Sequence, residues 1–118
     1  MGQSFKDLVV WQCAVELSSA IYKLTASFPE SERFGLTNQM RRASVSIASN
    51  IAEEYGKSSR GEYVLFLGHA RGSDCKFETQ LVLAENLGFG SAHLRTPAAE
   101  LCDDVSRMLV TMMRRLKQ

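Results

Sequence analysis

Apolar residues recur along most of the chain at alternating spacings of four and three, which is the period of one face of an α-helix. The first such segment runs from about Asp7 to Phe28 and stops before Pro29, because a proline disfavours helical backbone in the residue before it. Its predicted core stripe is Val10, Ala14, Leu17, Ile21, Leu24 and Phe28. A second strip, about 100° around the same helix, consists of Leu8, Trp11, Val15 and Tyr22. A helix in a monomeric bundle needs one buried stripe, so the second strip predicts an oligomer interface, where Trp and Tyr are favoured.

Three further helices follow from the same rhythm. The second spans about Leu36 to Tyr55, and the third spans about Glu62 to Leu87 and is capped by Gly88. The fourth begins near Ser91 or near Thr96-Pro97, where Thr at the cap and Pro at the first helical position form a start signal. The predicted core positions of these helices are Leu36, Met40, Ala43, Ile47 and Ile51; then Tyr63, Phe66, Leu67, Ala70, Phe77, Leu81 and Ala84; and finally Leu94, Ala98, Leu101, Val105, Met108, Met112 and Leu116.

Two residues of the third helix do not fit an apolar stripe. Asp74 falls on the core face, where a carboxylate must find charged or hydrogen-bonding partners. Gly72 lies in the helix interior and costs about 1 kcal/mol relative to Ala. We therefore expect a kink or a close helix crossing at Gly72.

The pattern as a whole predicts an all-α protein. No segment alternates as a strand does, and long helices with short connections predict an antiparallel, up-and-down four-helix bundle that forms one domain over residues 1–118. With 45% hydrophobic and 23% charged residues, the composition excludes wholesale disorder. No apolar run approaches the ~18 residues of a membrane span, and the N-terminus has no signal-peptide pattern. Cys13, Cys75 and Cys102 are separated and odd in number, so we expect free thiols and a cytoplasmic protein without membrane contact.

The sequence offers little catalytic chemistry. A di-iron bundle needs Glu-x-x-His motifs, but His69 and His93 follow Phe66 and Gly90 at that spacing. No Cys/His cluster has the spacing of a zinc site, and no glycine-rich motif follows a strand. We therefore expect no enzyme, no metal and no cofactor.

Charge leaves the partner open. Fourteen Lys and Arg balance thirteen Asp and Glu, which gives a net charge of +1 and no general preference for a polyanion. Locally, four cations lie along or just beyond the second helix and are the candidate phosphate contacts for nucleic acid: Arg41, Arg42, Lys57 and Arg60. The alternative is that these side chains are solvated or pair with nearby acids such as Glu53, Glu54 and Glu62.

Three blocks of sequence carry a resemblance to a known family. The first is Phe5–Gln12 followed by Phe28-Pro29; the second is Phe34–Ala43 with Ser46-Ile47 and Ser49–Glu53; the third is Phe66-Leu67, Ala70–Ser73 and Glu78–Leu81. In this order they resemble the bacterial four-helix-bundle proteins encoded by intervening sequences of 23S ribosomal RNA genes. The accessory protein of diversity-generating retroelements is similar to that family. Two departures are visible, since Glu54 stands where the family usually has Gly and Lys76 where it usually has an acidic residue.

The resemblance implies a ring-like homopentamer without established catalytic residues. Its retroelement relatives are basic and bind nucleic acid and a reverse transcriptase. We therefore expect a non-catalytic homo-oligomer with RNA or DNA as the leading partner. The alternative is a protein-interaction or structural scaffold that makes no contact with nucleic acid.

Overall fold

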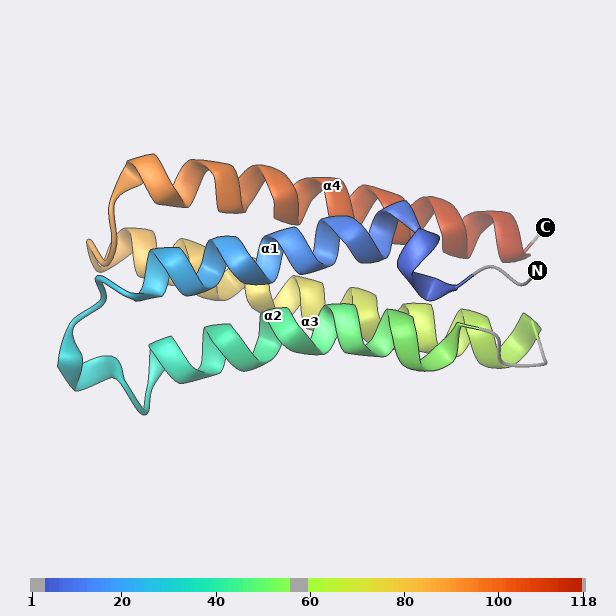
Figure 1. The fold of residues 1–118 in the computed structure, drawn as a ribbon, viewed down its shortest axis with the longest axis horizontal. Helices are drawn as coiled ribbons and strands as arrows, with labels where there is room; N and C mark the ends of the chain where they lie inside the picture. The colour runs from blue at the N-terminus through green and yellow to red at the C-terminus, as the bar shows by residue number, and fades with distance from the viewer. Residues whose placement is uncertain (1–3, 56–59, 118) are drawn as a thin grey trace.

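Four long helices make up the protein, in a computed structural model that describes residues 4–55 and 60–117. The elements are η1 (Phe5–Asp7), α1 (Val9–Thr25), η2 (Glu30–Glu32), α2 (Leu36–Glu54), α3 (Arg60–Asn86) and α4 (Ala92–Lys117). Consecutive helices run in opposite directions, so α1 begins at the end of the bundle where α4 finishes (Figure 1). Each helix packs against two others, because α1 and α3 both contact α2 and α4. The prediction of an all-α four-helix fold is confirmed, and the described ranges contain no strand.

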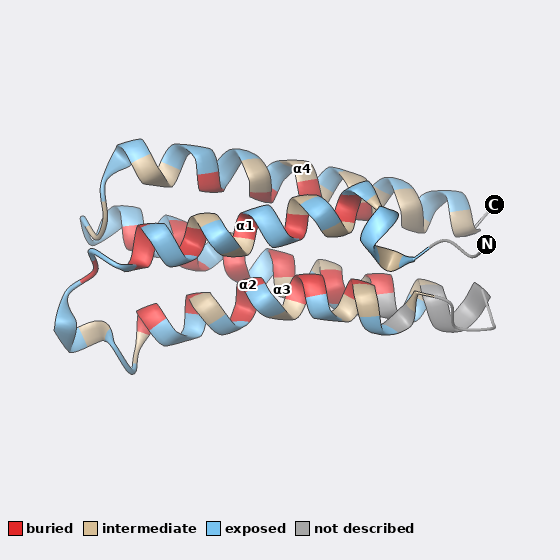
Figure 2. Ribbon diagram, viewed as in Figure 1, coloured by how far each residue is buried: buried red, intermediate tan, exposed pale blue. Residues whose placement is uncertain are grey.

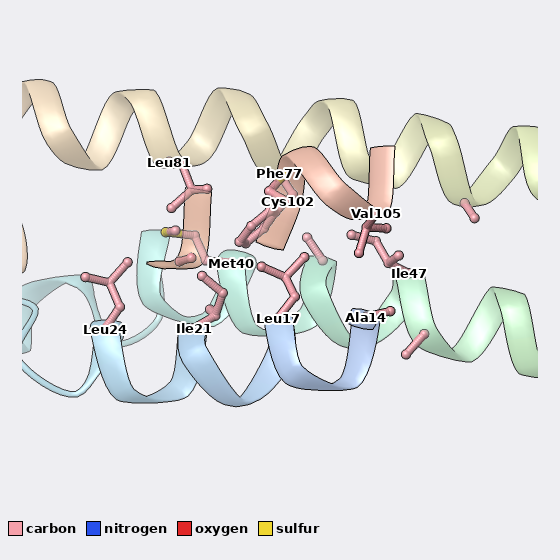
Figure 3. Close-up of a cluster of buried hydrophobic side chains, with 14 of the residues drawn as sticks. Ala14, Leu17, Ile21, Leu24, Met40, Ile47, Phe77, Leu81, Cys102 and Val105 are labelled. Atoms are coloured by element: carbon pink, nitrogen blue, oxygen red, sulfur yellow. The ribbon is translucent and has the colours of Figure 1, made fainter. Parts of the chain in front are cut away.

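The core is built from one stripe of each helix, as the red inner surfaces of Figure 2 show. All six residues of the stripe predicted for the first helix and all five of the α2 stripe are buried, as predicted. On α3 the predicted residues Leu67, Ala70, Phe77, Leu81 and Ala84 are buried, whereas the side chains of Tyr63 and Phe66 lie outside the described part. Side chains from all four helices point toward one another in the close-up of Figure 3.

The core stripe of α4 differs from the prediction. Its buried residues are Ala98, Cys102, Val105 and Leu109, whereas the predicted Leu94, Leu101, Met108, Met112 and Leu116 are only half-buried. Apolar residues occupy adjacent positions at Leu101/Cys102 and Met108/Leu109, so the apolar arc is wider than one stripe. Because α4 packs against both α1 and α3, the inner part of this arc enters the core and the remainder covers its edge.

Two helix ends also differ from the prediction. The first helix ends at Thr25, and Phe28 is buried in the turn that follows. The fourth helix begins at Ala92, because the Ser91 carbonyl accepts hydrogen bonds from the amides of Leu94 and Arg95 at 3.1 and 2.9 Å. The alternative start at Thr96-Pro97 is therefore wrong, and Pro97 lies inside α4.

Glycines serve different purposes at the ends and in the middle of the helices. Gly88 and Gly90 have φ values of 73° and 75°, which confirms the predicted left-handed cap at Gly88. A Cβ at Gly90 would lie 2.5 Å from Leu24 Cδ1, so the α3–α4 turn can pack on the end of α1 only with glycine there. Gly72 is exposed, and a Cβ there would meet nothing within 4 Å. The predicted close crossing at Gly72 is wrong, and α3 continues through it.

We expect Gly72→Ala to raise the free energy of unfolding by about 1 kcal/mol, because alanine restricts the unfolded chain and meets no steric obstacle in the helix. Gly90→Ala should lower the free energy of unfolding, because alanine is strained at a positive φ and its Cβ would clash with the Leu24 side chain. Urea denaturation followed by circular dichroism measures both changes. A loss of stability in Gly72→Ala would contradict the open surroundings of this position.

Candidate functional site

An apolar groove of about 610 Å³ runs along the outside of α1 and α2. Trp11, Val15 and Tyr22 of the predicted second strip line it on the α1 side, and Val45, Ala48 and Ala52 line it on the α2 side. Val15, Tyr22 and Val45 are 37%, 47% and 43% exposed, although their neighbours in sequence fill the core. The groove is therefore apolar surface that the monomer leaves uncovered.

The first residue of the predicted strip lies elsewhere. Leu8 caps α1 and lines a separate hollow with Met108 and Met112 of α4. Trp11 stays with the groove, and the Phe5 ring contacts it edge-on at a centroid distance of 5.2 Å. The structure thus brings three of the four predicted interface residues together and adds an α2 wall to them.

Arg41, a predicted phosphate contact, is engaged within the protein. Its Nε donates a hydrogen bond of 2.8 Å to Thr25 Oγ1, and its guanidinium lies 4.6 Å from the centre of the Tyr22 ring. A weaker hydrogen bond of 3.4 Å joins Nη2 to the Tyr22 carbonyl. These contacts connect α2 to the end of α1, and no acidic side chain of the described residues pairs with Arg41.

Arg42 is exposed and lines a polar groove of about 430 Å³ between α2 and α3. Lys76 of α3 lines the same groove, together with the small or amide-bearing side chains Asn38, Gln39, Ala43, Ser46 and Ser73. Lys57 and the side chain of Arg60 lie outside the described residues. The sequence analysis did not include Lys76 among the candidate phosphate contacts. The available signal was that Lys76 stands where the family usually has an acidic residue.

A third hollow joins the two grooves across α2. Tyr22 and Val45 line this hollow and the apolar groove, whereas Asn38, Arg42 and Ser46 line this hollow and the polar groove. The apolar and cationic surfaces are therefore neighbours that share one helix.

The buried Asp74 has the partners that the sequence required. Its side chain is fully buried; Oδ2 accepts a hydrogen bond from Arg71 Nη1 at 3.1 Å, and Oδ1 accepts one from the Cys102 thiol at 3.2 Å. Burial raises the pKa of Asp74, and the hydrogen bonds from Cys102 and Ser106 and the charge of Arg71 oppose that rise. Burial and the neighbouring Asp74 charge raise the pKa of Glu78 as well.

Asp74, Glu78 and Cys102 also form the one group of three potential metal ligands found among the described residues, with ligand atoms within 4.8 Å of one another. Arg71 already supplies a positive charge to the Asp74 carboxylate, and burial strongly raises the pKa of the Cys102 thiol, which keeps it protonated. The arrangement therefore acts as a hydrogen-bonded link between α3 and α4.

Comparison with known proteins gives a family and a fold. The family model described as "23S rRNA-intervening sequence protein" matches residues 6–111. The chain is also similar to the crystal structure of a protein of unknown function from the S23 ribosomal protein family of Bacteroides thetaiotaomicron, with a TM-score of 0.81 and 20% identity over 90% of this chain and 96% of that one. No curated protein sequence matches it. Within the described ranges, no helix has both the length and the apolar character to cross a membrane.

We expect the buried carboxylate to make stability depend on pH. Because the pKa of Asp74 is higher in the folded than in the unfolded state, the folded state holds the proton more tightly. The free energy of unfolding should therefore fall as pH rises from about 4, near the unfolded pKa, through the folded pKa.

Asp74→Asn removes this titration and should flatten the decline, whereas Glu85→Gln, at an exposed acid of the same helix, should leave it unchanged. Urea titrations between about pH 4 and pH 7 measure the slopes. Equal slopes for wild type and Asp74→Asn would contradict the assignment.

Proposed function

Because the chain belongs to the 23S rRNA-intervening sequence protein family, we propose that it is a non-catalytic bundle that self-associates and binds nucleic acid through backbone phosphates. The observation that carries the proposal is the apolar α1–α2 groove, in which Val15, Tyr22 and Val45 remain exposed outside the core. Contiguous apolar surface of this kind marks interaction sites on soluble domains. The groove combines the aromatic residues Phe5, Trp11 and Tyr22 with Lys23 and serines, and aromatic residues are enriched in protein interfaces.

A second copy of the chain is the occupant that we propose for this groove. A closed ring repeats one head-to-tail interface, in which the groove of each copy receives a different surface of the next copy, and the family resemblance implies five copies. The number five rests on that resemblance alone. The groove itself supports self-association without fixing the number of copies.

Nucleic acid enters the proposal through the position of Arg42. It is exposed beside Lys76, and both lie one flank away from the apolar groove. Self-association through that groove would repeat the cations around the assembly, and multivalent contact turns weak individual sites into useful affinity. A net charge of +1 per chain does not oppose this, because phosphate binding depends on local cations.

A scaffold that binds only protein is the second candidate, and one observation favours it. Arg41 lines the hollow beside Arg42, but its Nε donates to Thr25 Oγ1 and its guanidinium lies over the Tyr22 ring, which leaves fewer of its donors for a phosphate. Exposed apolar residues on α3 and in the turn after it would offer such a scaffold further contact area; they are Leu65, Val82, Leu83 and Leu87.

We expect Val45→Asp to dissociate the assembly without unfolding the chain. Val45 is 43% exposed in the monomer, so a carboxylate there is tolerated by the fold. In an apolar interface the same carboxylate would lose its hydration, which weakens association by about a hundredfold or more. Multi-angle light scattering across micromolar concentrations measures the change, and circular dichroism reports the fold.

Val82→Asp is the matched control, since Val82 is 57% exposed on α3 and lies outside the groove. Only monomer in the wild type would refute self-association. Dissociation by Val82→Asp but not by Val45→Asp would place the interface on α3.

We expect binding to single-stranded RNA and to duplex DNA to weaken steeply with salt and to depend little on sequence, because phosphate contacts release counterions and do not read bases. An assembly that contacts six or more phosphates should lose about a thousandfold in affinity between 50 and 200 mM salt. Charge reversal in Arg42→Glu with Arg60→Glu should reduce binding and leave the oligomer intact. Fluorescence anisotropy measures the affinities, and absence of wild-type binding at low salt would favour the scaffold.

A further inference from the structure

We infer that the polar groove between α2 and α3 is a phosphate-binding site, in which Arg42 and Lys76 hold one phosphate group between two helices. The inference deepens the proposed function and rests on its nucleic-acid part, since it names where a backbone phosphate sits. It adds Lys76 and the groove between the helices to the cations that the sequence singled out on α2.

The charge of the groove is the first argument. Arg42 comes from α2 and Lys76 from α3, both are exposed, and neither forms an ion pair with any described residue. Some other arginines in the described ranges are paired with acids, as Arg33 is with Glu30 and Arg71 with Asp74. Among the described side chains that line the groove, none is acidic. Two uncompensated cations on either side of one groove attract an anion between them.

The neutral lining is the second argument. Asn38 and Gln39 bring side-chain amides, and Ser46 and Ser73 bring hydroxyl groups, so the wall offers hydrogen-bond donors to an anion. The two hydroxyl oxygens lie 3.4 Å apart across the helix contact, and Asn50 Nδ2 donates to Ser46 Oγ at 3.3 Å. Ser46 and Ser73 of the groove lining are thus held by one contact between α2 and α3 and by one within α2.

The chemistry of the cations fits a phosphate group. The planar guanidinium of Arg42 can donate two hydrogen bonds to two oxygens of one phosphate, and the ammonium of Lys76 acts as a compact charge. A volume of about 430 Å³ exceeds that of a lone phosphate and leaves room for the attached groups. The phosphate can belong to a nucleic-acid backbone or be free in solution, and the experiment separates these two sources.

The test compares Arg42→Gln and Lys76→Gln with Arg33→Gln and Lys6→Gln, which remove the same charges from exposed sites away from the groove. A labelled single-stranded oligonucleotide is titrated with each protein. We expect each groove variant to weaken binding by at least about fivefold in 50 mM salt. Each should also lower the slope of log affinity against log salt by about 0.7 for every phosphate that the variant no longer neutralises. The control variants should bind as the wild type does.

A titration with inorganic phosphate supplies the second arm. The NMR resonances of the Asn38 and Gln39 side-chain amides should shift in the wild type and stay unchanged in a variant that combines Arg42→Gln and Lys76→Gln. If inorganic phosphate shifts these resonances and the oligonucleotide does not bind, the groove is a binding site for a free phosphate compound and the nucleic-acid proposal is wrong. If the oligonucleotide binds and the groove variants match the controls, the groove assignment is wrong and the nucleic-acid proposal survives. If neither probe binds, both are wrong.

Discussion

Each helix can turn only one stripe of its surface toward the core, and this limit decides where the other apolar and charged side chains go. On α1, Leu17 and Ile21 fill the stripe and have no exposed surface, so Trp11 and Val15 must lie outside it and line a groove. The same limit acts on α2, which buries one stripe and has two flanks left. One flank contributes to the apolar groove and the other to the polar groove. The helix nearest to both candidate surfaces is therefore also a full contributor to the core.

Asp74 is the exception that links two helices specifically. A carboxylate without partners on a core stripe would be strongly destabilising, so it requires donors at fixed positions on a neighbouring helix. Arg71 supplies one from the same helix, whereas Cys102 and Ser106 supply theirs from α4. If α4 slid by one turn along α3, Asp74 would lose the hydrogen bonds from Cys102 and Ser106. The apolar residues of α4 would still find other apolar residues to contact. The buried acid therefore favours one register of α3 against α4, which apolar packing alone would specify less sharply.

Periodicity predicts the fold where a helix has one narrow apolar stripe and fails where the stripe is wide. The α1 and α2 stripes follow from the spacing of apolar residues alone. On α4 either Leu101 or its neighbour Cys102 could face the core, depending on how the helix is rotated about its axis. The packing of α4 in the bundle decides this, and Cys102 is the buried residue. The candidate site shows a similar division. Sequence places Arg41 and Arg42 side by side, and both line the hollow across α2. The 100° between consecutive residues nevertheless lets only Arg42 line the polar groove as well. Lys76 is more than thirty residues further along, so its place beside Arg42 depends on how α3 packs.

The near-neutral charge of the chain is compatible with a polyanion because charge acts over a short range. At physiological salt the screening length is about 8 Å, so a phosphate in the polar groove responds to Arg42 and Lys76 far more than to acids elsewhere on the bundle. Paired acids contribute less still, since Asp74 and Asp104 face arginines of their own helices. What matters for binding is therefore the presence of uncompensated cations on one face. A bundle can present such cations when some of its basic residues pair with acidic residues and others have no acidic neighbour. The net charge of the chain is the same in either arrangement.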